Sequence, residues 1–477
     1  MAFPKPPFKI NKDVGKADAA LVKYLKTNGN FSYLQAETRT LIGKLTAHDL
    51  RTQNSLLLEV WPKVLTDALR KLKQHDPREW DRKNNRVSYS SFFHEGSLGV
   101  TDLRNVLESF AKFESMLYGA SPDRYRDHIA HAFRVWIIGQ GVLREHGCLG
   151  GLLFSDELLD SKELPDGRDV PAGKICSDEW ECMWALAALC HDLGYPLSHI
   201  DRINSLARDA LRQMGLVHAG DLRFGFSQQM LPFHETIIRL MSSRPVRQGD
   251  QFGTHLQNKY YLKFLKSFDN LDHGIVSALL VSKSLVYFLE SDLSQDERGL
   301  LSEDDAKQFL IRREILRAVG AHTCQDVYHL RFDTLSFLLY MIDELQCWGR
   351  PTLEELQHQA ADMPEAEAEV VCFQPKKVAI IVRTGTRKWS VEQQKATRNQ
   401  LSKLQSMLRL GVGTSVLKDH YLEFAVVPNK GRGVHLLLKK GKLAVKNVDA
   451  SSLDCRRGRS SPGGSKPARG GQVRTGP

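Results

Sequence analysis

The sequence predicts a mainly α-helical protein, in which a helical bundle core is followed by a small α+β domain and a disordered tail. Apolar residues recur at helical spacing through most of the first 350 or so positions, and β-rich runs replace that pattern beyond about residue 370. After about Asn447 the chain is rich in Gly, Ser, Pro and Arg. With 477 residues, the chain exceeds the roughly 250–300 at which one hydrophobic core stops growing, so several units are expected.

Residues 1–120 are expected to form an N-terminal helical segment, because apolar positions recur at helical spacing from Ala17 to about Leu117. Residues 121–360 form the predicted core domain. Within it, the Asp-, Gly- and Pro-rich residues 155–174 indicate a loop, and residues 242–253 indicate a polar connection. Gly and Pro at positions 349 and 351 end the last helix of this domain.

The C-terminal domain is expected at residues 370–445, after an acidic run that ends at Glu369. Residues 377–382, 422–427 and 434–438 are β-rich, and a Gly-containing turn between the last two favours a hairpin. A helix is predicted over 391–410. Residues 446–477 are expected to be a disordered basic tail, since their composition cannot bury enough apolar surface to offset the entropy of ordering.

Composition restricts the classes of function. A net charge of +10 and a pI near 9.1 favour anionic partners such as nucleotides or phosphorylated metabolites, and the basic tail makes nucleic acid an open alternative. No stretch approaches the roughly 18 consecutive apolar residues that span a bilayer, and the first residues do not resemble a secretory signal. The eight cysteines include no C-x-x-C pair, which is typical of free thiols in a reducing compartment. A cytoplasmic protein without a membrane partner is therefore expected.

The most informative segment is an apolar helix, residues 184–190, that ends in His191 and Asp192 just before Gly194 and Pro196. Gly and Pro stop a helix, so the two polar side chains stand at its C-terminal end. Imidazole and carboxylate are both metal ligands, and adjacent residues there can reach one ion or two neighbouring ions. The segment predicts part of a metal site; a helix-end capping pair is the alternative.

Four further predicted helices carry the same types of residue. Asp127 and His131 are four residues apart, on one face of a predicted helix. His273 opens another helix, and His322 lies in a third. Asp343 lies in an otherwise apolar helix, where an unpaired carboxylate is costly and therefore needs a partner.

In their order along the chain, these residues resemble the HD superfamily of metal-dependent phosphohydrolases. The helical core of that family carries a His, a His-Asp pair and a final Asp on separate helices. His131, His191 with Asp192, and Asp343 match this set. His131 is preferred to His128 because it lies four residues before a valine, as in the first helix of the family.

The resemblance covers about residues 127–351 and implies an HD-type helical bundle that hydrolyses a phosphoester or phosphoanhydride bond. Members that bind two metals carry further histidines, which His273 and His322 match, so Asp192 would bridge the ions and Asp127 could add an acid. One or two divalent ions are expected, and Mn, Fe, Mg, Zn and Ni are not distinguished. Some two-iron relatives oxidise their substrates, so oxygenase chemistry stays open.

A second resemblance is to deoxynucleoside triphosphate triphosphohydrolases. Residues 189–199 are similar to the His-Asp segment of those enzymes, and residues 233–235, Phe-His-Glu, are similar to a later His-Glu. Tyr195 is a departure, because those enzymes usually carry a histidine there. The Gly-Tyr-Pro at 194–196 does not match the cyclic-di-nucleotide phosphodiesterases named for that tripeptide, whose motif lies far downstream of the His-Asp pair.

Further residues are candidates for catalysis. Imidazole titrates near neutral pH, so three histidines are candidates to protonate the leaving oxygen, namely His128, His199 and His234. Arg350 is a candidate to bind substrate phosphate, because a guanidinium matches phosphate oxygens bidentately. The alternatives are structural: a salt bridge from Asp343 to Arg313 or Arg350, and satisfied core, capping or surface roles for the histidines.

These observations predict a metal-dependent phosphohydrolase that acts on a nucleotide, either as a phosphodiesterase or as a triphosphohydrolase. A non-catalytic nucleotide-binding sensor built on an HD core is the alternative. A nucleic-acid-binding protein that uses the basic tail is a third hypothesis. The sequence makes no prediction of the oligomeric state.

Overall fold

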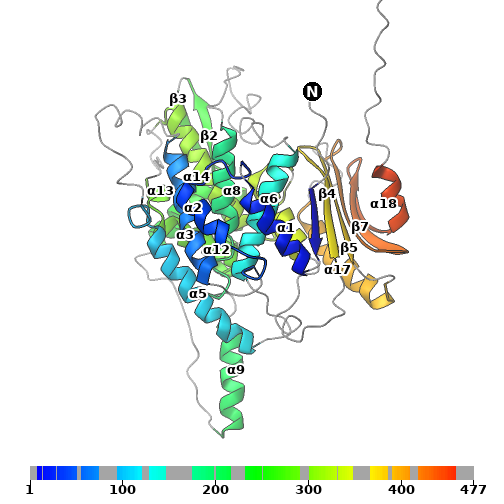
Figure 1. The fold of residues 1–477 in the computed structure, drawn as a ribbon. Helices are drawn as coiled ribbons and strands as arrows, with labels where there is room; N and C mark the ends of the chain where they lie inside the picture. Colours follow the sequence, from blue (N-terminus) through cyan, green and yellow to red (C-terminus); the bar gives the residue numbers. More distant parts are fainter. Residues whose placement is uncertain are drawn as a thin grey trace, which may run out of the picture.

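The computed structural model is mainly helical with a small sheet formed largely by the C-terminal region, as the sequence predicts (Figure 1). It describes residues 8–12, 14–27, 29–50, 55–74, 94–120, 128–146, 175–197, 200–215, 231–249, 251–290, 300–329, 331–347, 366–384, 389–408 and 417–457.

Helices follow one another through the described residues of the N-terminal segment and the core, and one hairpin, β2–β3, lies between α10 and α11. In chain order the elements are α1 (Val14–Lys26), α2 (Ala36–Lys44), α3 (Ser55–Gln74), α5 (Val100–Ala120), α6 (His128–His146), α8 (Ser177–Cys190), α9 (Ile200–Gln213), α10 (Leu231–Ser242), β2 (Ser243–Gln248), β3 (Gln251–Leu256), α11 (Asn258–Asp269), α12 (His273–Ser284), α13 (Val286–Leu289), α14 (Glu303–Ala321) and α15 (Leu335–Cys347).

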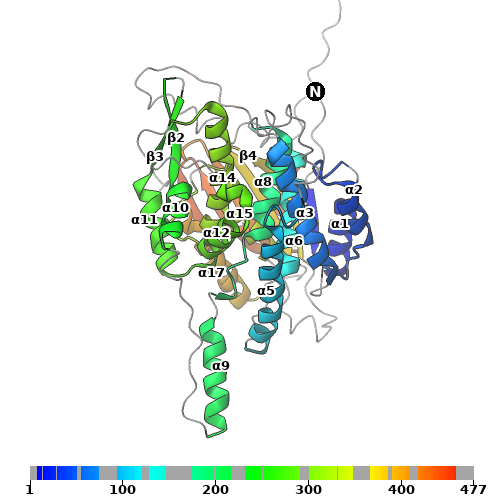
Figure 2. The same ribbon diagram turned by 90° about the vertical axis from the view of Figure 1, so that its left-hand side faces the viewer.

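Helix α8 is the centre of the bundle. Every residue from Glu179 to Cys190 is buried. From Cys182 onward these residues are all apolar, as expected for a helix that is buried on all sides. It packs against α3, α6 and α14 (Figure 2). Because α8 lies in the middle of these helices, the residues that follow Cys190 emerge where several helix ends meet.

Indole hydrogen bonds hold α8 in place. Trp61 of α3 donates to the carbonyl of Leu189 at 3.0 Å, and Trp184 donates to the carbonyl of Trp136 in α6 at 2.8 Å. At this crossing a Cβ on Gly139 would lie 1.9 Å from the Trp184 ring, so only glycine allows α6 to approach so closely. The end of α8 is therefore tied to two neighbouring helices.

The C-terminal sheet matches the strands and hairpin expected there. Its elements are β4 (Ala366–Gln374), β5 (Lys377–Thr384), α17 (Val391–Ser406), β6 (Tyr421–Pro428), β7 (Arg432–Lys439), β8 (Lys442–Asp449) and α18 (Ala450–Arg457). The strand order is β1-β4-β5-β6-β7-β8, and only β5 and β6 are parallel. Helix α17 connects these two strands, as a parallel crossover requires. The ring of Phe373 in β4 contacts the ring of Phe337 in α15 at a tilt of 53°, with centroids 5.9 Å apart, so the sheet packs on the bundle.

The N-terminal segment is not wholly helical, contrary to expectation. Strand β1 (Phe8–Lys12) pairs antiparallel with β4, with Phe8 opposite Val370. A five-residue strand that finds its partner more than 350 positions away leaves no local periodic pattern. The acidic run around Glu369 is likewise part of β4, not a separator between domains.

Two other boundaries differ from the predictions. The expected polar connection over 242–253 is a hairpin of β2 and β3, in which Gln248 pairs with Gln251 and Gly249 has a φ of +65°, as a tight turn favours. The expected tail begins too early at residue 446, because β8 and α18 continue through Arg457. Leu453 of α18 is buried against the sheet, so a short apolar contact orders a polar segment. Residues 458–477 and the predicted loop 155–174 lie outside the described residues.

Candidate metal centre

Side chains from five helices meet at the C-terminal end of α8. His131 lies in the first turn of α6, and His191 is the residue that caps the C-terminus of α8, followed by Asp192. His273 is the first residue of α12, His322 caps the C-terminus of α14, and Asp343 lies in α15. The structure thus brings together all six residues that the sequence proposed as ligands.

Asp192 lies at the centre of this group. Its Oδ2 is 3.3 Å from Nε2 of His191 and 3.7 Å from Nε2 of His131. Its Oδ1 is 3.3 Å from Nε2 of His273 and 3.5 Å from Nε2 of His322. The two oxygens of one carboxylate therefore face two different pairs of imidazoles, which is the arrangement of a carboxylate that could bridge two ions.

Asp343 completes one side of the centre. Its Oδ1 is 2.9 Å from Nε2 of His131 and 3.9 Å from Nε2 of His191. Two overlapping groups, His131–His191–Asp343 and His191–Asp192–His322, have their ligand atoms within 4.8 Å of one another. Nitrogen and carboxylate oxygen at such separations could hold a divalent metal ion.

Hydrogen bonds fix the direction of the imidazoles. Nδ1 of His191 donates to the carbonyl of Ala188 at 2.7 Å, and Nδ1 of His322 donates to the carbonyl of Val319 at 2.6 Å. In the neutral form that binds a metal, each of these rings consequently carries its lone pair on Nε2, which faces the centre. In the described part of the chain these two Nε2 atoms are buried and have no hydrogen-bond partner. Two buried Nε2 atoms that lie beside carboxylates without a hydrogen-bond partner fit a site for a cation.

His131 is oriented from another helix. Its Nδ1 donates a hydrogen bond to the amide oxygen of Gln346. Gln346 is buried and follows Asp343 by one turn of α15. The same helix therefore contacts both ring nitrogens of His131. Gln346 is not among the residues predicted from the sequence, although its i+3 spacing from Asp343 is a signal that could have indicated it.

The charge distribution of the centre favours cations. Burial lowers the pKa of His191, but the adjacent Asp192 and Asp343 outweigh that effect and raise this pKa to about 9. Burial opposes ionisation of both acids, yet the surrounding histidines hold the pKa of Asp192 well below its usual range and lower the pKa of Asp343 to about 2. Burial lowers the pKa of His322. Two ionised carboxylates in a buried site require positive charge nearby.

Two glycines allow the helix ends to meet. A Cβ on Gly194 would lie 2.5 Å from the carbonyl oxygen of His273, and one on Gly274 would lie 2.7 Å from the carbonyl oxygen of Val319. Leu271, just before the start of α12, has a φ of +54°, a left-handed conformation that is uncommon for a branched side chain. The backbone is thus held in a tight turn that places His273 next to Asp192.

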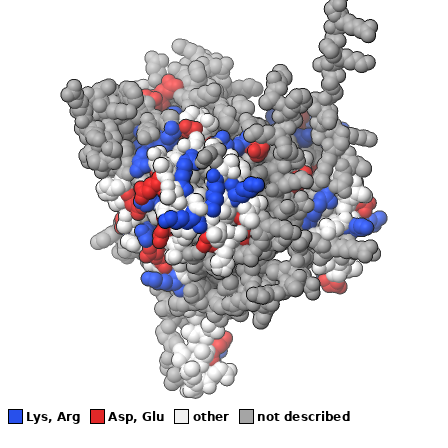
Figure 3. Space-filling view, viewed as in Figure 1, with Lys and Arg blue, Asp and Glu red and all other residues white. Residues whose placement is uncertain are grey.

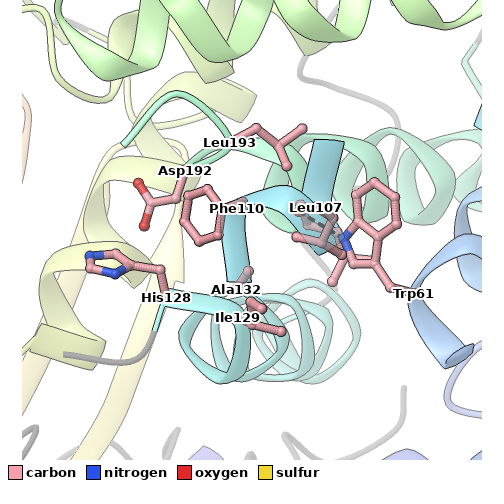
Figure 4. A pocket seen from close by; sticks show the side chains of 9 residues that line it. Trp61, Leu107, Phe110, His128, Ile129, Ala132, Asp192 and Leu193 are labelled. Carbon is pink, nitrogen blue, oxygen red and sulfur yellow. Dashed lines mark hydrogen bonds between the residues drawn. The ribbon is translucent and has the colours of Figure 1, made fainter. Parts of the chain in front are cut away.

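His128 lies at the edge of the centre. Its ring stacks on Tyr195, with centroids 3.6 Å apart and an interplanar angle of 29°. His128 and Asp192 line one end of a small cavity of about 10 Å³, with Phe110 next to them and Trp61 at the other end (Figure 4). This volume is about the room that one water molecule needs. A proton donor and a water-sized space therefore adjoin the central carboxylate.

The other candidates are not part of the two ligand groups. His234 is buried on α10, where its ring lies 5.2 Å from that of Phe268. Burial, with Lys283 nearby, lowers its pKa. Arg313, a proposed partner of Asp343, instead contacts Glu314 beside it. Three candidates lie outside the described residues, namely Asp127, His199 and Arg350.

Comparisons with known proteins add no identification. No protein-family model, no curated protein and no solved structure matches this chain. Within the described residues, no helix is long and apolar enough to cross a membrane.

Proposed function

We propose that this chain is a metal-dependent phosphohydrolase of the HD type that acts on a nucleotide. The observation that carries the proposal is the position of Asp192, whose two carboxylate oxygens face two different pairs of histidines. Phosphoryl-transfer centres use two neighbouring ions to stabilise the attacking and the leaving oxygen. The proposal is also supported by the net charge of +10, which favours anionic substrates.

The ligands divide into two sets around the shared carboxylate. His131, His191 and Asp343 would hold one ion with Asp192. His273 and His322 would hold a second, with the other oxygen of Asp192. A divalent metal bound there supplies a Lewis acid that activates water and neutralises phosphate charge.

The remaining chemistry belongs to protein side chains. His128 is a candidate to protonate the leaving oxygen, because its ring adjoins Asp192 and imidazole exchanges protons near neutral pH. Stacking on Tyr195 restricts the orientation of that ring. The three fixed Nδ1 hydrogen bonds, on His131, His191 and His322, keep the ligands preorganised.

The test combines metal analysis with turnover. Protein purified without chelator is assayed for metal content, and then for hydrolysis of cyclic mononucleotides, linear dinucleotides and nucleoside triphosphates with Mn²⁺, Fe²⁺, Mg²⁺, Zn²⁺ or Ni²⁺. We expect hydrolysis of one class and loss of both metal and turnover in Asp192→Asn. His255→Ala is the control, because His255 is an exposed histidine on β3.

Each outcome has a defined meaning. About two ions per chain, with one lost in His273→Ala, would support the two-metal assignment. Bound metal without turnover of any nucleotide class would favour a non-catalytic sensor, and oxygen consumption in place of hydrolysis would favour oxygenase chemistry. Protein that binds no divalent metal would contradict the proposal.

A further inference from the structure

Helix α9 projects from the bundle. It extends below the other helices in both ribbon views (Figures 1 and 2), and among the described elements its main contact is with α5. Its first turn is anchored, because Ile203 and Asn204 are buried. Gly215, with a φ of +75°, has the left-handed conformation that commonly follows the end of a helix. The segment is therefore a complete helix that is attached to the protein near one end.

The projecting part of α9 carries an apolar stripe. Its members recur at helical spacing and so share one face of the helix, namely Leu206, Ala207, Ala210, Leu211 and Met214. Leu206 is 45% exposed, and Met214, just after the last residue of α9, is 73% exposed. An apolar face that is this open to water on a monomer indicates a contact surface.

Charged side chains lie away from the apolar stripe. Arg208, Asp209 and Arg212 occupy the opposite face, because a helix has about 3.6 residues per turn. Nη1 of Arg212 lies 3.7 Å from Asp209, so the charges on that face are partly matched within α9. In Figure 3, the side of α9 that faces the viewer, at the bottom of the picture, is mostly uncharged. A surface that covers the stripe therefore has to be apolar.

A helix of this kind needs a partner. Helix α9 has 14 residues, and isolated helices of that length are marginal in water, since most of their stability in proteins comes from packing an apolar face. Past Asn204, every described side chain of α9 except the half-buried Leu211 is exposed. The described part of the chain thus leaves most of the apolar face uncovered.

The apolar face has a two-fold symmetric order of side chains. On the two sides of a midpoint between positions 208 and 209, residues of similar size correspond in pairs, namely Ile203 with Met214, Leu206 with Leu211, and Ala207 with Ala210. A two-fold axis brings the same surface of two copies together, so it requires a self-complementary pattern of this kind. In an antiparallel pair of α9 helices, Ala207 would face Ala210 of the second copy.

The two alanines favour a second copy over a membrane. Small side chains at the centre of a contact let two helix axes approach closely, because the distance between packed helices depends on the side chains between them. Alanine offers little apolar area to a bilayer, and binding to a bilayer scales with the apolar area that is buried. The centre of the stripe therefore suits a helix better than it suits lipid.

We infer that α9 is a homodimerisation helix, whose apolar stripe packs antiparallel on the same stripe of a second copy. Two helices of this length bury less than the roughly 1,200 Å² of a stable interface, so the dimer is weak and depends on protein concentration. The inference is independent of the metal centre and of the proposed hydrolase activity.

Sedimentation equilibrium of the full-length protein tests the inference. The wild type should pass reversibly from monomer to dimer as its concentration rises. Leu206→Glu should raise the dissociation constant by about tenfold or more, because a charge would be buried without a partner in each copy. Leu262→Glu is the matched control, since Leu262 is 62% exposed on α11. A wild type that stays monomeric, or equal association of the two variants, would overturn the inference.

Two charge variants test the antiparallel register. Ala207→Glu and Ala210→Lys should each associate more weakly than the wild type, because each new charge would face an alanine of the second copy. Mixing the two proteins should restore association, since the new carboxylate at position 207 would then face the new ammonium group at position 210. If the mixture associates no better than either protein alone, the antiparallel pairing is wrong.

Vesicles test the other possible occupant of the stripe. If the wild type stays monomeric but binds vesicles of phosphatidylcholine and phosphatidylglycerol, and Leu206→Glu abolishes that binding, the stripe meets a membrane and the inference is overturned. Circular dichroism and metal content are measured on every variant and should match those of the wild type. Failure of the dimer is thereby distinguished from misfolding and from failure of the proposed hydrolase.

Discussion

Gln346 accepts a hydrogen bond from Nδ1 of His131, on the side of the imidazole that faces away from Asp192 and Asp343. The two residues are 215 positions apart in sequence. Because Gln346 holds the proton on Nδ1, the lone pair of the neutral ring is kept on Nε2, where a metal would bind.

Gln346→Leu should therefore weaken metal binding by about 10- to 100-fold, the usual effect of removing such a partner. Gln346→Glu should keep the affinity, because its carboxylate still accepts from Nδ1. Affinity is measured by competition with a chelator. Gln140→Leu is the control, since Gln140 is also a buried glutamine but bonds the carbonyl of Asn30. An equal loss in both leucine variants would indicate general destabilisation instead.

Gly194→Ala should disturb the centre through sterics. The new methyl group would lie 2.5 Å from the carbonyl oxygen of His273, so α12 must shift, at a cost of about 1–3 kcal/mol in the free energy of unfolding. Metal content should fall as well, because His273 moves from Asp192. Urea unfolding and elemental analysis measure the two effects.

Gly43→Ala is the matched control for that substitution. Gly43 lies in α2, and a Cβ there meets no atom within 4 Å. Since alanine is favoured over glycine inside a helix by about 1 kcal/mol, this variant should be neutral or slightly stabilised. Equal stability of the two alanine variants would show that the close approach of Gly194 is not rigid.

Metal removal should destabilise the protein. Nε2 of His191 and of His322 are buried without a hydrogen-bond partner in the described structure, so a bound ion satisfies groups that are otherwise desolvated. Ligand at a hundred times its dissociation constant stabilises the native state by about 2.7 kcal/mol. Chelator should lower the melting temperature of the wild type and leave that of Asp192→Asn unchanged. If neither chelator nor added metal changes the melting temperature of the wild-type protein, that result would argue against a metal site.

Stability should fall in mild acid because of His329. Burial lowers the pKa of His329 to about 4, so the unfolded chain binds a proton that the folded chain excludes between about pH 6.5 and 4. The neutral ring contributes stability that is fully present above pH 6.5 and lost as the pH falls toward 4. The loss is on the order of 3 kcal/mol, since one pKa unit corresponds to about 1.4 kcal/mol.

His329→Gln removes this titration and should flatten the fall in melting temperature between pH 7 and 5. His255→Gln, which changes an exposed histidine, should keep the wild-type slope. If the slopes of all three proteins agree, other groups cause the acid sensitivity.

Local patterns in the sequence were sufficient to predict the mainly helical fold class, the hairpin of β6 and β7, and the position of His191 and Asp192 at a helix end. Each depends on residues within one or two turns, where apolar periodicity and helix-stop residues act directly. The strand β1 and the start of β4 could not be predicted in this way. Their pairing joins Phe8 to Val370. The local pattern of apolar residues in either segment does not indicate which strand it pairs with.

The sequence by itself was sufficient to predict that five helices of an apolar bundle carry these residues: His191 and Asp192 at the end of one, and His131, His273, His322 and Asp343 on four others. Only the tertiary structure decided which ring nitrogen faces which oxygen of Asp192, that Gln346 orients His131, and that Gly194 and Gly274 let the helix ends meet. The physical reason is the separation along the chain between the residues that interact. Helix periodicity is encoded by near neighbours, whereas the direction of a lone pair and the shape of a pocket depend on packing between residues that are far apart along the chain.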